Sequence, residues 1–92
     1  MHNKKKLWHA AGAMTTIEMS ELSFNEIIDS NDLVIIDFWA EWCGPCRAYA
    51  PVFERVSELF PEVVFAKVDT EVEKALAGSF GIRSIPTTVA FR

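Results

Sequence analysis

Residues 33–46 read Leu-Val-Ile-Ile-Asp-Phe-Trp-Ala-Glu-Trp-Cys-Gly-Pro-Cys and carry the strongest structural signal in the chain. Its first seven residues are nearly all apolar and rich in β-branched and aromatic side chains, which predicts a strand buried on both faces. A helix should begin near Cys43, because Pro45 suits the first turn of a helix, where no backbone donor is needed. The two cysteines therefore fall at the junction of a buried strand and a helix.

Strands and helices alternate on both sides of this stretch. The predicted elements are an edge strand at 16–19, a helix starting at a capping box at 23–26, the strand 33–39, a helix from 43 to 60 that Pro51 should kink, a strand at 63–68, a helix at 71–80 and a strand at 87–91. This β-α-β-α-β-α-β order predicts an α/β fold, a sheet with parallel pairs and covering helices. Four aromatic side chains are expected in the core: Phe53, Phe60, Phe65 and Phe80.

Length and charge exclude several classes of protein. The chain has 92 residues, half of them apolar, which fits one small domain at residues 15–92 after a flexible extension at 1–14. No apolar run approaches the roughly 18 residues of a membrane span, and no secretory signal is recognisable, so we expect a cytoplasmic protein without a membrane partner. Residues 15–92 carry thirteen acidic and six basic side chains, so nucleic acid is not an expected partner.

The two cysteines, Cys43 and Cys46, favour redox chemistry over a structural role. A bridge between them closes a four-residue loop and would stabilise the fold by roughly 2 kcal/mol, which makes it a weak staple. Cys43 lies at the helix start, where unpaired amide donors and the helix dipole favour a thiolate. Cys46, one turn further on, should be less exposed and remain a thiol. We therefore expect Cys43 to attack a substrate and Cys46 to resolve the intermediate.

The cysteine pair and Asp37 each allow a second interpretation. A zinc site would need four ligands, and only His2 and His9 remain besides the cysteines, so neither a metal nor another cofactor is expected. Asp37 lies within an apolar strand, where burial of an unpaired carboxylate is costly and raises its pKa. We therefore favour a functional role for Asp37 over a merely tolerated charge.

The motif residues resemble one family closely. The stretch 37–46, together with Ala50-Pro51, Val68-Asp69 and residues 81–87 (Gly-Ile-Arg-Ser-Ile-Pro-Thr), is similar to the corresponding segments of thioredoxins, in the same order and at matching spacing. The resemblance covers roughly residues 15–92. It implies a three-layer fold with a central mixed sheet covered by helices. It also implies reduction of protein disulfides through a mixed disulfide on Cys43 that Cys46 releases.

The resemblance assigns roles to further residues by position. Asp37 matches the buried acid that takes or relays the proton of Cys46, and Lys67 matches the lysine beside that acid. Pro86 matches a cis-proline next to the disulfide. The surface that receives the substrate would be formed by Trp42, Gly44, Pro45, Ile85 and Pro86. The implied partners are disulfide-containing proteins and an NADPH-dependent thioredoxin reductase.

The end of the chain departs from the family pattern. Thioredoxins continue past the strand matched by 87–91 with a further strand, a Gly-containing loop and a final helix, whereas this sequence ends at Arg92. We therefore expect an open strand edge, one uncovered sheet face and a smaller substrate groove. Two alternatives to a full reductase stay open: a binding module that needs no turnover, and a truncated fragment with weakened redox activity.

Overall fold

The computed structural model describes residues 15–92, and its elements follow the predicted order. They are β1 (Ile17–Glu18), α2 (Phe24–Ser30), β2 (Val34–Trp39), α3 (Gly44–Leu59), β3 (Val64–Asp69), α4 (Lys74–Ser79) and β4 (Thr87–Phe91). The extension expected at residues 1–14 lies outside the described residues. None of the helices in 15–92 has the length and apolar character needed to cross a membrane.

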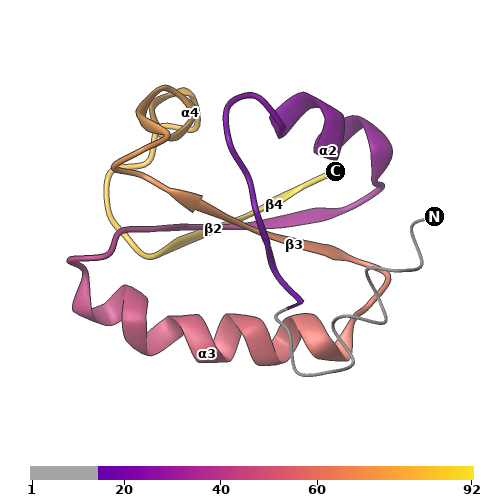
Figure 1. Ribbon diagram of the computed structural model, residues 1–92, viewed down its shortest axis with the longest axis horizontal. Helices are drawn as coiled ribbons and strands as arrows, with labels where there is room; N and C mark the ends of the chain where they lie inside the picture. Colours follow the sequence, from indigo (N-terminus) through magenta and orange to yellow (C-terminus); the bar gives the residue numbers. More distant parts are fainter. Residues whose placement is uncertain (1–14) are drawn as a thin grey trace.

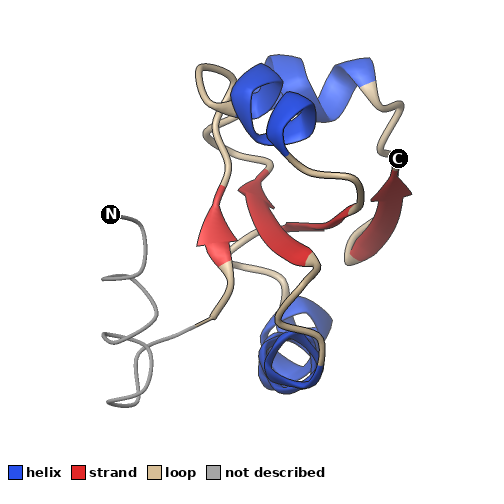
Figure 2. Cartoon of the chain, turned by 90° about the vertical axis from the view of Figure 1, so that its right-hand side faces the viewer, coloured by secondary structure: helices blue, strands red, loops and turns tan. Residues whose placement is uncertain are grey.

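The sheet is mixed and places β2 at its centre. The strand order is β1-β3-β2-β4, with β3 parallel to both β1 and β2 and with β4 antiparallel to β2. Helix α3 covers one face of the sheet, while α2 and α4 cover the other (Figures 1 and 2). The predicted three-layer α/β architecture is confirmed.

The core lies on the side of the sheet that α2 and α4 cover. Val34, Ile36 and Phe38 of β2 are fully buried, as are Ala66 and Val68 of β3. Aromatic rings close this layer by edge-on and tilted contacts, which join Phe24, Phe38, Phe80 and Phe91. Burial of β2 on both faces agrees with its nearly continuous apolar sequence.

The α3 side of the sheet is less completely covered. Phe53 of α3 packs edge-on against Phe65 of β3, with 5.4 Å between ring centroids, and both are buried as predicted. Phe60 is 47% exposed, so its assignment to the core was wrong. The reason is local: Phe60 directly follows the last residue of α3, and its backbone has already left the helical conformation.

An apolar groove of about 370 Å³ runs between α3 and the sheet. Its lining comprises Leu33, Ile35, Tyr49, Val52, Phe53, Val56, Phe60, Val63 and Phe65. Beside it, β4 forms an edge of the sheet, and no strand within 15–92 pairs with its outer side. The open edge and the incompletely covered face expected from the sequence are therefore present in the described residues.

Two helix starts differ from the sequence-based expectation. The helix predicted at 71–80 begins only at Lys74, because the carboxylate and carbonyl of Asp69 accept hydrogen bonds from the amides of Glu71, Val72 and Glu73 and hold these residues in turns. The capping box at 23–26 is not formed. The Ser23 hydroxyl accepts the amide of Ser20 instead of capping α2. Pro51 lies inside α3 as predicted, and the kink remains a prediction.

The first described residues are tied to the middle of α3. The Glu54 carboxylate accepts hydrogen bonds from the backbone and hydroxyl of Thr15 and from the hydroxyl of Thr16, and the Thr15 hydroxyl also contacts the hydroxyl of Ser57. Burial would raise the pKa of Glu54, but these hydrogen bonds outweigh it and hold the pKa below its ordinary value. These contacts hold the segment before β1 against α3.

We predict a graded loss of stability from truncation of Ile36, which is fully buried in β2. Ile36→Val should lower the free energy of unfolding by about 0.5–1.5 kcal/mol and Ile36→Ala by about 2–5 kcal/mol, because both remove buried methyl groups and leave a cavity. Leu22 is 96% exposed, so Leu22→Ala should change it by less than about 0.5 kcal/mol. Urea denaturation followed by circular dichroism measures all three, and equal losses at both positions would contradict this core assignment.

Candidate active site

The cysteine pair sits where β2 passes into α3. The loop is closed by a hydrogen bond from the Cys43 amide to the Ala40 carbonyl, at 3.1 Å. Cys43 is the N-cap residue of α3 with extended backbone, and Gly44 and Pro45 form the start of the helix. The Cys46 amide donates to the Cys43 Sγ at 3.2 Å. The Cys46 amide, in the first turn of the helix and without a backbone partner, thus points at the sulfur that is expected to attack, as the sequence predicted.

The two cysteines form a disulfide, with 5.2 Å between their Cα atoms. Cys43 is 4% exposed and Cys46 is 2% exposed, so the expected difference in exposure is small in this oxidised state. Both side chains belong to a small cluster with Ala40, and Trp39 and Ile85 pack against it. The asymmetry between the two sulfurs therefore lies in the amide that faces Cys43, rather than in their accessibility.

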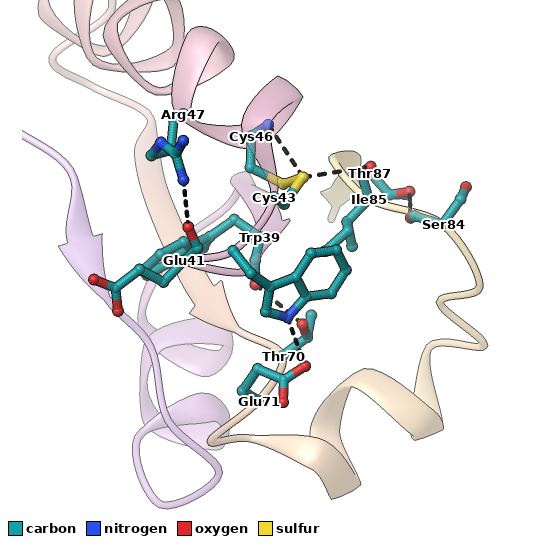
Figure 3. The surroundings of a disulfide bond; sticks show 11 residues. Trp39, Glu41, Cys43, Cys46, Arg47, Thr70, Glu71, Ser84, Ile85 and Thr87 are labelled. Carbon is teal, nitrogen blue, oxygen red and sulfur yellow. Dashed lines mark hydrogen bonds between the residues drawn. A yellow bond between two sulfur atoms is a disulfide. The ribbon is translucent and has the colours of Figure 1, made fainter.

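A loop distant in sequence completes the site. The Ile85–Pro86 peptide bond is cis, as the resemblance implied. The carbonyl oxygen of Ile85 lies 3.8 Å from the Cys43 Sγ, and Figure 3 shows Ile85 beside the disulfide. The segment before β4 and the start of α3 thus meet at one edge of the sheet.

Two tryptophans flank this junction and differ in environment. Trp42 is 67% exposed, and its indole Nε1 donates to the Glu71 carboxylate at 3.1 Å. Trp39 is half-buried, with the Lys67 ammonium 5.0 Å from its ring centroid and its buried Nε1 without a partner among residues 15–92. Trp42 is therefore the tryptophan that a partner molecule can reach, as its position in the loop predicted.

Sequence reasoning missed two residues that follow β3. The amide and hydroxyl of Thr70 both donate to the Trp39 carbonyl, at 2.9 and 3.1 Å, and Glu71 holds the Trp42 indole. Figure 3 shows both residues below the disulfide loop. Their position could have been inferred, because the carboxyl ends of the parallel strands β2 and β3 meet at the same edge.

Asp37 is a buried acidic residue in the middle of the central strand β2. It is 1% exposed, and neither carboxylate oxygen has a hydrogen-bond partner among the described residues. Burial raises the pKa of Asp37 to about 6, while Lys67, its register partner on β3, acts in the opposite direction. The structure brings Asp37 and Lys67 together. It shows no hydrogen bond between Asp37 and Cys46 in the oxidised state.

Comparison with known proteins agrees with this geometry. The thioredoxin family model matches residues 15–92. Thioredoxin C-3 of Corynebacterium nephridii is 53% identical over 74 residues, which are 79% of this chain and 51% of that protein. A bifunctional thioredoxin reductase/thioredoxin of Mycobacterium leprae is 41% identical over 85 residues, which are 90% of this chain and 19% of that protein.

Solved structures give the same result. Thioredoxin from Plasmodium falciparum superposes with a TM-score of 0.79 at 40% identity, covering 84% of this chain and 76% of that one. The chain spans about half the length of the first curated relatives that it matches. The family match extends over the whole described fold and includes the strand–helix junction that carries the disulfide. The chain therefore belongs to the thioredoxin family.

Proposed function

We propose that this chain is a protein thiol–disulfide oxidoreductase that reduces disulfides of other proteins by dithiol–disulfide exchange. The observation that carries the proposal is the Cys43–Cys46 disulfide at the N-terminus of α3, with a backbone amide directed at Cys43. In this proposal residues 15–92 act as one thioredoxin-like domain and residues 1–14 as an extension to it.

The reaction begins from the reduced dithiol. The Cys43 thiolate attacks one sulfur of the substrate disulfide, forms a mixed disulfide and expels the other substrate sulfur as a thiolate, which takes up a proton. Cys46 loses its proton and attacks the Cys43 sulfur, which expels the second substrate thiolate. The substrate has then gained two electrons and two protons, and Cys43 and Cys46 are joined as in the structure.

Acidity of Cys43 supplies only part of the rate. Each unit by which a thiol pKa falls towards the ambient pH raises its thiolate fraction up to about tenfold but lowers its nucleophilicity about threefold. The larger contribution comes from Cys46, which the helix holds one turn away on the same side as Cys43. This placement makes the release step intramolecular.

Asp37 and Lys67 serve the second step in this proposal. Cys46 must lose a proton before it attacks, and a buried carboxyl with a pKa of about 6 can accept one near neutral pH. Lys67 limits how far burial raises that pKa. No direct contact with Cys46 exists in the oxidised state, so a transfer would need a rearrangement or a bridging water.

The substrate surface surrounds the disulfide. Trp42 and the Ile85–Pro86 turn contribute apolar area on two sides, and Gly44 and Pro45 leave the helix start without bulky side chains. An extended substrate segment could lie across this surface with its disulfide facing Cys43.

Regeneration requires an external two-electron donor. We propose an NADPH-dependent thioredoxin reductase, which is supported by the Mycobacterium leprae relative, whose name joins a reductase and a thioredoxin in one chain. Within this proposal the exchange takes place in the cytoplasm, where thiols are kept reduced.

Reduction of insulin by dithiothreitol tests the activity. We expect the wild-type chain to accelerate insulin precipitation and Cys43→Ser to give only the rate of dithiothreitol alone, because the attacking sulfur is missing. Cys46→Ser, the matched control, should form a stable mixed disulfide that non-reducing electrophoresis detects. A wild-type rate no higher than that of Cys43→Ser would refute the proposed function.

The stability of the oxidised protein should depend on Asp37. The pKa of this carboxyl is raised in the folded state from 3.8 to about 6, so the folded state retains a proton that the unfolded state releases. The free energy of unfolding should therefore fall as the pH rises from about 4 to about 6, by about 3 kcal/mol from this group, and stay lower above that window. Asp37→Asn should remove this loss and be more stable than wild type at pH 7.

The comparison is made by urea denaturation of both oxidised proteins across this pH range. Taking the difference between variant and wild type cancels the other acids, including Glu54, whose lowered pKa acts in the opposite direction. Lys67→Gln should extend the loss to higher pH, because without Lys67 the pKa of Asp37 rises further in the folded state and stays the same in the unfolded state. A stability difference that does not change between pH 4 and pH 7 would show that Asp37 titrates normally.

A further inference from the structure

A second groove lies beside the disulfide loop and is lined by residues of α4 and of the segment that precedes β4. It measures about 350 Å³, and we call it the basic groove because two of its lining residues are cationic. The residues that matter here are Trp42, Lys74, Ala77, Ile82, Arg83 and Ile85. Ile85 also contacts the Cys43 sulfur, so the groove is continuous with the surface next to the reacting atom.

The charge of this groove contrasts with that of the domain. Residues 15–92 hold thirteen acidic and only six basic side chains, yet two of the six line this one groove. Lys74 and Arg83 are both exposed, and neither forms an ion pair with another residue in 15–92. Both charges are therefore available to a negatively charged ligand. The rest of the domain surface is acidic and would repel such a ligand.

Acidic side chains lie near the groove but do not line it. The Glu71 carboxylate accepts the Trp42 indole, and the carboxylates of Glu73 and Glu21 accept the amides of Glu21 and Ala75 at the start of α4. These hydrogen bonds come from neutral donors and leave the carboxylates charged. The lining itself is basic, with acids close by, so the expected selectivity is a few-fold rather than orders of magnitude.

The spacing along the chain relates these charges to the reacting sulfur. Arg83 precedes Ile85 by two residues, so their Cα atoms are at most about 7 Å apart. Lys74, the first residue of α4, lines the same groove. A substrate segment that runs from Cys43 along this groove would bring side chains two or three positions from its cysteine towards these cations.

We propose that the basic groove makes this chain selective for disulfides in extended segments that carry Asp or Glu two or three residues from the attacked cysteine. The proposal rests on the proposed disulfide-exchange activity and names its substrate class. The apolar floor formed by Ala77, Ile82 and Ile85 holds the segment, and the ammonium of Lys74 and the guanidinium of Arg83 meet its carboxylates.

Three peptides of equal length test this selectivity. Each has one cysteine carrying 2-nitro-5-thiobenzoate as a mixed disulfide, with Glu, Gln or Lys at the second and third positions on both sides. Reduced protein attacks the peptide sulfur through Cys43 and expels the coloured thiolate, so a single turnover is followed by absorbance. Rates with 2-mercaptoethanol, a neutral thiol, correct for the intrinsic reactivity of each peptide.

The wild-type protein should react with the Glu peptide about fivefold faster than with the Gln peptide, and slowest with the Lys peptide, because two exposed ion pairs give a modest gain. Raising the ionic strength from about 0.01 M to about 1 M shortens the Debye length from about 30 Å to about 3 Å and should bring the ratio close to one.

Substitutions distinguish an effect of the groove from an effect of the net charge of the protein. The double variant Lys74→Gln/Arg83→Gln should lose the preference for the Glu peptide while keeping the wild-type rate on the Gln peptide. Arg55→Gln removes one exposed charge from α3, on the opposite face of the sheet, and should keep the preference.

The outcomes distinguish the two proposals. Three results would overturn the selectivity and leave the disulfide-exchange activity standing. They are equal corrected rates on the Glu and Gln peptides, an unchanged preference in the double variant, and a loss in Arg55→Gln that is as large per removed charge as in the double variant. A wild-type rate on the Gln peptide no higher than that of Cys43→Ser would instead overturn the activity itself.

Discussion

Strand β2 pairs with β3 on one edge and with β4 on the other, and the position of the active-site loop follows from this pairing. Hydrogen bonding on both edges and burial on both faces leave this strand a single position and register, because a slip by one residue would turn its apolar side chains to the opposite faces. The chain therefore enters the loop at Ala40 in a fixed direction, and Cys43 arrives at the N-terminus of α3. The pairing of β2 on both edges thus sets the position of the Cys43 sulfur.

The same strand carries Asp37, whose burial lowers the stability of the fold. Asp37 lies between hydrogen-bonded neighbours on β3 and β4, without a partner for either carboxylate oxygen. Above its pKa, the folded state holds a charge that the unfolded state would expose to water. A domain as small as residues 15–92 has only a small free energy of unfolding, so a buried acid in its central strand is a considerable cost. Such a cost fits the role proposed for Asp37, that of accepting the proton of Cys46.

Much of this arrangement was predictable from residues 33–46, because a nearly continuous apolar strand followed by Cys-Gly-Pro-Cys gives strong local signals. The helix start at Cys43, the exposure of Trp42 and the burial of Phe53 required no tertiary information. Phe60 was wrongly assigned to the core because the periodicity did not show that α3 ends at Leu59, one residue earlier. The late start of α4 follows from a side-chain contact of Asp69, and the place of Glu71 follows from strand pairing, neither of which periodicity records.

The tie between Thr15 and Glu54 has a practical consequence for protein engineering. It attaches the upstream end of the domain to α3 eleven residues after Cys43, which corresponds to roughly 16 Å along the helix axis. A carrier protein, an affinity tag or a resin linker joined ahead of Thr15 would emerge away from the sulfur and leave the edge that carries the disulfide unobstructed. With the activity proposed above, the chain could be immobilised through that end as a reusable reagent for opening disulfides.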